Sequence, residues 1–83
     1  MQNNPEIKQI PQEVLFGIPI VSITGNKEIV IENYHGIIEY TDCIVRIRTK
    51  IGEIKIKGQN LNLIYFNSDD MLITGIIKEV KYL

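Results

Sequence analysis

The chain has 83 residues, with 9 basic and 10 acidic side chains and a formal net charge of -1. The length corresponds to one small domain, and the near-neutral charge argues against a nucleic-acid binder that works through a broad basic surface. Apolar residues make up 45% of the chain and aromatic residues 7%. Most of the apolar residues are isoleucines, so the composition favours β-strands.

The cysteine content and the N-terminus indicate a cytoplasmic protein. Cys43 is the single cysteine and has no partner for an internal disulfide, and the first residues do not form a charged and apolar signal segment. No apolar run reaches the roughly 20 residues that a transmembrane helix needs. We therefore expect a protein without a transmembrane segment, for which peripheral contact with a membrane stays open.

The N-terminal part contains a tail and the first strand. Residues 1–10 are polar and aperiodic, which predicts a flexible tail before a single domain at residues 11–83. Residues 11–17, PQEVLFG, predict a short helical turn, because proline stands at the start and glycine at the end. A strand is expected at residues 20–24, and Gly25-Asn26 predicts the turn that follows it.

Residues 29–57 alternate isoleucine and valine with charged residues, and three turns within them predict hairpins whose registers agree. The turns are centred on Tyr34-His35, Asp42-Cys43 and Lys50-Ile51. Each register keeps apolar residues on one face and charged residues on the other. The expected pairs are Ile31–Ile38, Ile29–Tyr40, Tyr40–Val45, Ile38–Ile47, Glu39–Arg46, Ile47–Ile54, Val45–Ile56 and Arg48–Glu53.

Three further signals complete the prediction of the fold. Gln59-Asn60 predicts a fourth tight turn, residues 67–70 predict a polar turn, and Gly75 predicts a bulge or bend that lets one long strand serve two neighbours. The result is an antiparallel meander of about seven short strands, curled into a small open barrel or a two-layer sheet. The alternative is a β-solenoid, because stacked rungs also give short isoleucine-rich strands punctuated by glycine. The expected inner face is Ile29, Ile31, Ile38, Tyr40, Val45, Ile47, Ile54, Ile56, Leu63 and Tyr65.

The residues that could carry chemistry are few. His35 stands in a predicted turn, and Cys43 also lies in a predicted turn, where we interpret it as an unreactive small residue. Asp69-Asp70 has oxygen ligands but lacks the spacing of a calcium loop, and one cysteine with one histidine cannot supply a zinc site. We therefore expect no enzyme, no catalytic residues, no cofactor and no metal.

The outer face of the hairpin at residues 44–58 carries the candidate interaction patch, which consists of Arg46, Arg48, Lys55 and Lys57. Arg46 stands directly opposite Lys55 in the expected register, and like charges in this position lower stability. One interpretation is a solvated face neutralised by Glu39 and Glu53. The other is a docking patch for an acidic protein surface or for anionic membrane headgroups.

Several motifs together resemble the YabP/YqfC family of sporulation proteins of endospore-forming Firmicutes, and more closely its YqfC branch. The matching segments read PQEVLFGIP at 11–19, ITGN at 23–26, IENYHGIIEYT at 31–41 and TKIGEIKIKGQNL at 49–61. The similarity continues from Ile73 to Leu83 and so covers nearly all of the chain after the tail. The segments at 31–41 and 49–61 are fairly specific in combination, and each is weak alone.

The resemblance implies a non-enzymatic factor required for endospore formation, acting as a structural or protein-interaction module. It implies a place in the mother cell, in the cytoplasm or peripheral at the outer forespore membrane, and a membrane-associated sporulation protein as the first partner to test. A homo-oligomer is expected, since exposed sheet edges are a usual route to association. The alternatives are a small ligand-binding β-domain, which predicts a deep pocket near His35, and a polymer-forming β-scaffold.

Overall fold

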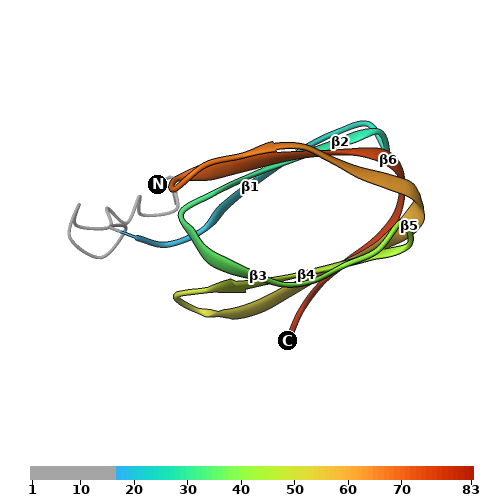
Figure 1. Ribbon diagram of the computed structural model, residues 1–83. Helices are drawn as coiled ribbons and strands as arrows, with labels where there is room; N and C mark the ends of the chain where they lie inside the picture. The colour runs from blue at the N-terminus through green and yellow to red at the C-terminus, as the bar shows by residue number, and fades with distance from the viewer. Residues whose placement is uncertain (1–16) are drawn as a thin grey trace, which may run out of the picture.

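The computed structural model describes residues 17–83, and every regular element in this range is a β-strand. The strands are β1 (Ile20–Thr24), β2 (Glu28–Glu32), β3 (Tyr34–Tyr40), β4 (Ile44–Thr49), β5 (Gly52–Phe66) and β6 (Asp70–Tyr82). They form a six-stranded sheet in the order β1-β2-β6-β5-β4-β3, and all neighbours are antiparallel (Figure 1). The predicted all-β fold is confirmed, and the solenoid alternative is wrong because a solenoid needs parallel rungs.

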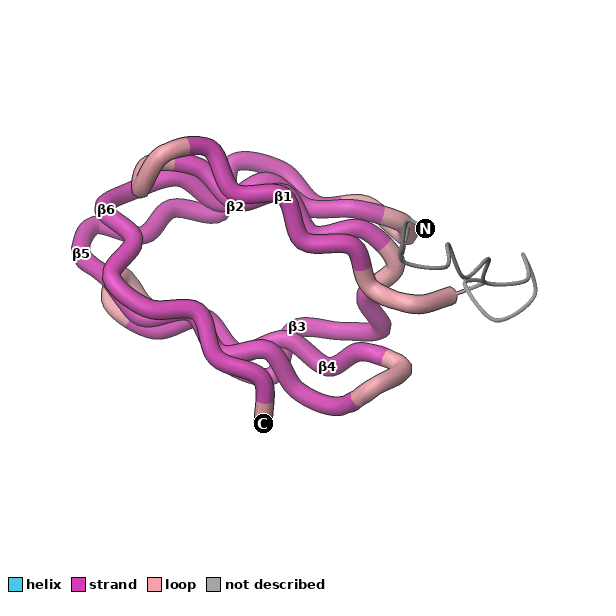
Figure 2. The backbone as a smooth tube through the Cα atoms, turned by 180° about the vertical axis from the view of Figure 1, so that it is seen from behind, coloured by secondary structure: helices cyan, strands magenta, loops and turns pink. Residues whose placement is uncertain are grey.

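The long strands β5 and β6 bend near their middle and fold the sheet into two facing layers (Figure 2). The first half of β5 pairs with β4 and with the second half of β6, whereas the first half of β6 pairs with β2 and with the second half of β5. One layer, the β1β2 layer, therefore contains β1, β2 and the halves of β5 and β6 beside them. The other, the β3β4 layer, contains β3, β4 and the remaining halves.

Carbonyl groups of two turns accept hydrogen bonds from the backbone amides at the bends of β5 and β6. The turn before β4 accepts amide hydrogens from Gly58 and Leu61, at N–O distances of 3.0 and 2.7 Å. The turn before β2 accepts them from Gly75 and Ile77, at 3.1 and 2.8 Å. Because buried backbone groups need partners, these turns allow β5 and β6 to change direction without leaving amides unpaired. The prediction that Gly75 lets one long strand serve two neighbours is confirmed.

The predicted turn at Gln59-Asn60 is wrong, and it accounts for the difference between seven expected strands and six observed ones. Asn60 has the positive φ of 52° that its residue type tolerates, but the chain bends there and continues within β5. The true reversal after β5 lies at residues 67–69, where a turn was expected. As a result Ile54 and Ile56 pair with β6, opposite Tyr82 and Val80.

The first predicted hairpin, centred on Tyr34-His35, is also wrong. β2 pairs with β1 and β6, and β3 pairs with β4, so Ile31 does not face Ile38. Asn33 makes a corner between the layers with a φ of 63°, and its backbone amide donates to the carbonyl of Asp69 at 2.7 Å. Its side-chain Nδ2 donates to the carbonyl of Ile18 at 3.0 Å. The corner is therefore held by residues distant in sequence, which a local pattern does not reveal.

The remaining hairpin registers largely agree with the prediction. The β4–β5 pairs are all confirmed, as are Glu39–Arg46 and Tyr40–Val45 between β3 and β4. A register shift between Ile37 and Glu39 places Ile37, in place of the expected Ile38, opposite Ile47. One added residue in a strand reverses which side chains face the core, so the bulge turns Ile37 inward.

The core lies between the two layers and is built mainly from isoleucines. Six of its members were expected and are fully buried: Ile29, Ile31, Val45, Ile47, Ile54 and Ile56. Leu63 packs against this core as expected, but Tyr40 and Tyr65 are 44% and 42% exposed. Those two assignments are wrong, and so is that of Ile38, because Ile37 packs against the core in its place. The buried residues that the prediction missed come from the bend of β5 and from β6: Leu61, Met71, Ile73 and Ile77.

The predicted tail at residues 1–10 and nearly all of the predicted helical turn, residues 11–16, lie outside the described residues. Within residues 17–83, no helix has the length and the apolar character that crossing a bilayer requires.

Candidate interaction surface

The expected patch of basic residues lies on the outer side of the β3β4 layer. Val45 and Ile47 on β4, like Ile54 and Ile56 on β5, are fully buried. Because side chains alternate along a strand, the residues between them point outward. The structure therefore brings Arg46, Arg48, Lys55 and Lys57 together on one surface, which we call the basic face.

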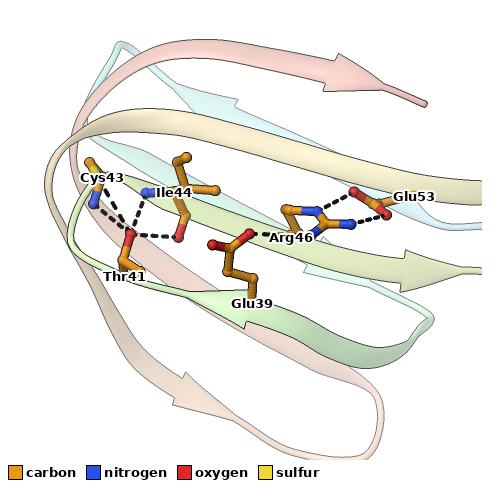
Figure 3. Close-up of polar contacts among 6 residues, drawn as sticks. All are labelled: Glu39, Thr41, Cys43, Ile44, Arg46 and Glu53. Carbon is orange, nitrogen blue, oxygen red and sulfur yellow. Dashed lines mark hydrogen bonds and ion pairs between the residues drawn. The ribbon is translucent and has the colours of Figure 1, made fainter.

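Arg46 is the member of the basic face that carboxylates neutralise (Figure 3). Its Nε and Nη2 donate to the two carboxylate oxygens of Glu53 at 2.6 and 2.9 Å. Its Nη1 donates to Glu39 Oε1 at 3.3 Å. Two parallel hydrogen bonds from a guanidinium to a carboxylate fix the geometry of both groups. Arg46 is thus a bridge across β3, β4 and β5.

These hydrogen bonds displace the pKa values of both partners. The Arg46 guanidinium donates to the carboxylate of Glu53, and more weakly to that of Glu39, and these hydrogen bonds raise its pKa. The same hydrogen bonds from Arg46 hold the pKa of Glu53 below its ordinary value. The bridge therefore favours the charged forms of Arg46 and Glu53.

We expect Arg46→Gln to lower the stability of the domain and to weaken its dependence on acid pH. The pKa of Glu53 is lower in the folded state than in the unfolded state. Its contribution to the stability of the fold is therefore present above the ordinary glutamate pKa of about 4.3, and it is lost as the pH falls through the folded-state pKa. Urea titrations of both proteins at neutral pH and at about pH 3 measure this, since the difference in midpoint should shrink at the acid pH. An equal difference at the two pH values would contradict the assignment.

Lys81 and Glu79 on β6 also belong to the basic face, and the sequence-based interpretation missed them. Lys81 pairs with Lys55, and Glu79 pairs with Lys57, in the second half of β6. Lys81 is exposed next to Val80, which packs against the core. The predicted turn at Gln59-Asn60 separates β6 from the first half of β5, so the prediction does not place Lys81 beside Lys55. Arg46, Lys55 and Lys81 thus form a row of cations across three adjacent strands.

In the predicted turns at Asp42-Cys43 and at residues 67–70, side-chain oxygens accept hydrogen bonds from backbone amides. Thr41 Oγ1 accepts hydrogen bonds from the amides of Cys43 and Ile44, at 3.2 and 3.0 Å (Figure 3). Asn67 Oδ1 accepts from the amides of Asp69 and Asp70, at 2.7 and 2.9 Å. Such bonds are the usual basis of turns at these residue types. Cys43 is a free, exposed cysteine.

An open hollow of about 660 Å³ lies beside His35, between the start of β3 and the end of β5. Its size falls within the roughly 300–1,000 Å³ typical of ligand pockets. It is lined mainly by apolar surface, from Tyr34, His35, Gly36, Ile37, Phe66, Asn67 and Ser68.

A hydrogen bond joins two of the residues that line the hollow. The Tyr34 hydroxyl donates to the carbonyl oxygen of Asn67. Burial, and then the negative charges of Asp70 and Asp69, raise the pKa of this phenol, which keeps it a hydrogen-bond donor. Within residues 17–83, no group of three or more histidine, cysteine, aspartate or glutamate side chains is arranged to hold a metal ion.

The fold is a small all-β domain, a bent two-layer β-sheet. The features on its surface are the basic face and the open hollow beside His35. The chain belongs to the YabP family, whose model matches residues 19–83. It is 30% identical over 74 residues to the uncharacterized protein YqfC of Bacillus subtilis (strain 168), an alignment that covers 89% of this chain and 80% of that one. The resemblance to the YabP/YqfC family is thereby confirmed. No solved structure matches the chain.

Proposed function

We propose that this protein is a non-enzymatic interaction module required for endospore formation, which acts in the mother cell near the outer forespore membrane. Its membership of the YabP family supports the link to sporulation, since the resemblance implies that role. The protein docks through its basic face on an acidic surface of a partner protein. The first partner to test is a membrane-associated sporulation protein, and self-association is expected as well.

The row of cations across the β3β4 layer is the observation that carries this proposal. Lys55 stands between Arg46 and Lys81 in the register of three adjacent strands. Within residues 17–83, the carboxylates of Glu39 and Glu53 form ion pairs with Arg46, and no ion pair links Lys55 or Lys81 to a carboxylate. Like charges in adjacent cross-strand positions are destabilising, and an acidic partner would offset that repulsion.

The test is a pull-down from sporulating host cells with wild-type protein and with the double variant Lys55→Glu, Lys57→Glu as bait. We expect the variant to lose a membrane-associated partner that the wild type retains, and to reduce the yield of heat-resistant spores when it replaces the wild-type gene. Arg46 is kept because it stabilises the fold. Lys78→Glu is the matched control, since Lys78 is exposed at an irregular position of β6. Equal capture by the double variant and the wild type would refute docking through the basic face.

The hollow beside His35 favours a second candidate function, the binding of a small apolar ligand. Its volume and apolar lining suit such a ligand, and Phe66 at its rim is 60% exposed. We expect an apolar fluorescent dye to bind the wild type in a saturable manner and to bind Phe66→Ser several-fold more weakly. Tyr82→Ser is the control, because Tyr82 is equally exposed but does not line the hollow. Equal binding by both variants would exclude this site.

A further inference from the structure

The outer side of the β1β2 layer carries the opposite charge to the basic face. Ile29 and Ile31 on β2, and Met71 on β6, are fully buried, so the residues that alternate with them point outward. The carboxylates placed there define what we call the acidic face: Glu28, Glu32 and Asp70. Lys27 and Asp69 lie in the turns at its two ends.

The acidic face repeats the arrangement of the basic face with the sign of charge reversed. Glu32 stands directly opposite Asp70 on the neighbouring strand, and no ion pair links either to a cation of residues 17–83. Two carboxylates in this position repel each other. An apolar row runs beside them, in which Val30 pairs with Leu72 and Leu72 pairs with Tyr65.

We propose that the partner of the basic face is the acidic face of a second copy of this chain. The two faces lie on the outer sides of opposite layers of the folded sheet, so one copy presents both (Figure 1). This inference rests on the proposed function in one respect, namely that the basic face docks on an acidic protein surface. Stacking places the row containing Lys55 and Lys81 against Glu32 and Asp70, which offsets the repulsion on both faces.

The apolar row of the acidic face fits the same partner. Val30 and Leu72 are half-buried and Tyr65 is 42% exposed. Lysine and arginine side chains cover apolar surface with their aliphatic stems while their charged ends reach carboxylates. The contact joins two different surfaces, so each added copy leaves one face of each kind free. Such a contact builds rings if the rotation closes and filaments if it does not.

Sedimentation velocity of the full chain over a range of concentrations tests the inference. At low ionic strength we expect the wild type to exceed the 9.5 kDa of one chain and to grow with concentration. Raising the salt to about 0.5 M should return it towards the monomer, because screening acts strongly on exposed charges. A wild type that stays at 9.5 kDa under all these conditions would overturn the proposal.

A charge swap separates this contact from other routes of association. The acidic-face variant Glu28→Lys, Glu32→Lys has two basic faces, and the basic-face variant Lys55→Glu, Lys81→Glu has two acidic ones. We expect each variant alone to be monomeric and an equimolar mixture to regain association. Circular dichroism verifies that each variant is folded, and Lys78→Glu should associate as the wild type does.

The outcomes distinguish this inference from the proposed function. If each variant alone associates like the wild type, or if the mixture stays monomeric while the wild type associates, contact between the faces is wrong. A wild type that is monomeric but captures a membrane-associated partner through the basic face would leave the proposed function intact and remove self-stacking. Because pairing of opposite charges drives the contact, association that does not weaken at high salt would point to sheet edges in place of the two faces.

Discussion

Gly58→Ala should lower the free energy of unfolding by about 2 kcal/mol or more, which is a large part of the stability of so small a domain. A Cβ added at Gly58 would lie 2.1 Å from the carbonyl oxygen of Ile76 and 3.0 Å from the Leu61 side chain. The oxygen belongs to the backbone of β6, so it cannot move aside without shifting the strand. The close approach of β5 and β6 at the bend therefore requires glycine.

The measurement is urea unfolding, in which we expect the midpoint to fall by about 1–2 M. Gly36→Ala is the matched control, because a Cβ at Gly36 meets nothing within 4 Å and the backbone there does not have a positive φ. Its midpoint should stay near that of the wild type. A similar loss in both variants would mean that the general cost of replacing glycine, and not the contact with Ile76, determines the effect.

Ile54→Ala should cost about 2–5 kcal/mol and leave the domain partly unfolded at room temperature. Ile54 is fully buried, and it stands between Ile47 on β4 and Tyr82 on β6 in the sheet. Truncation removes buried apolar surface and leaves a cavity in a core that has few residues to spare. A loss of the dispersed amide signals of the folded protein in a two-dimensional NMR spectrum would show this unfolding directly.

Ile51→Ala provides the comparison for the same substitution at the surface. Ile51 is 58% exposed in the turn between β4 and β5, so its truncation should change the free energy of unfolding by no more than about 0.5 kcal/mol. If Ile54→Ala were as mild as Ile51→Ala, the packing of the two layers around Ile54 would be incorrect.

Local sequence patterning is enough to define those hairpins in which both faces of the strands are constrained at once. Between β4 and β5, apolar residues must share one side and charged residues the other, so a slip by one position would set isoleucine against arginine. The same register predicts that Arg46, Arg48, Lys55 and Lys57 share the outer side. The same constraint acts between β3 and β4, where the predicted pair of Arg46 with Glu39 is confirmed.

The positions of the bends and the pairing of distant strands depend on long-range contacts. Asn33 and Asn60 are both asparagines, a residue type that favours tight turns. Asn33 nevertheless forms a corner between the layers, and Asn60 forms a bend within β5. Their conformations depend on contacts from elsewhere in the chain, such as the amide of Asn33 donating to Asp69. Local residue preferences are the same for a reversal, a corner and a bend, so they do not distinguish these outcomes.

The acidic face and the place of Lys81 on the basic face follow from those long-range pairings. β2 pairs with the first half of β6, which follows it at a distance in the sequence, and this pairing places Glu32 beside Asp70. The alternation along each strand indicated which residues point outward, but the neighbour across the sheet is set by packing of the whole chain. Charge on a surface is therefore readable from sequence strand by strand, whereas its arrangement into faces requires the fold.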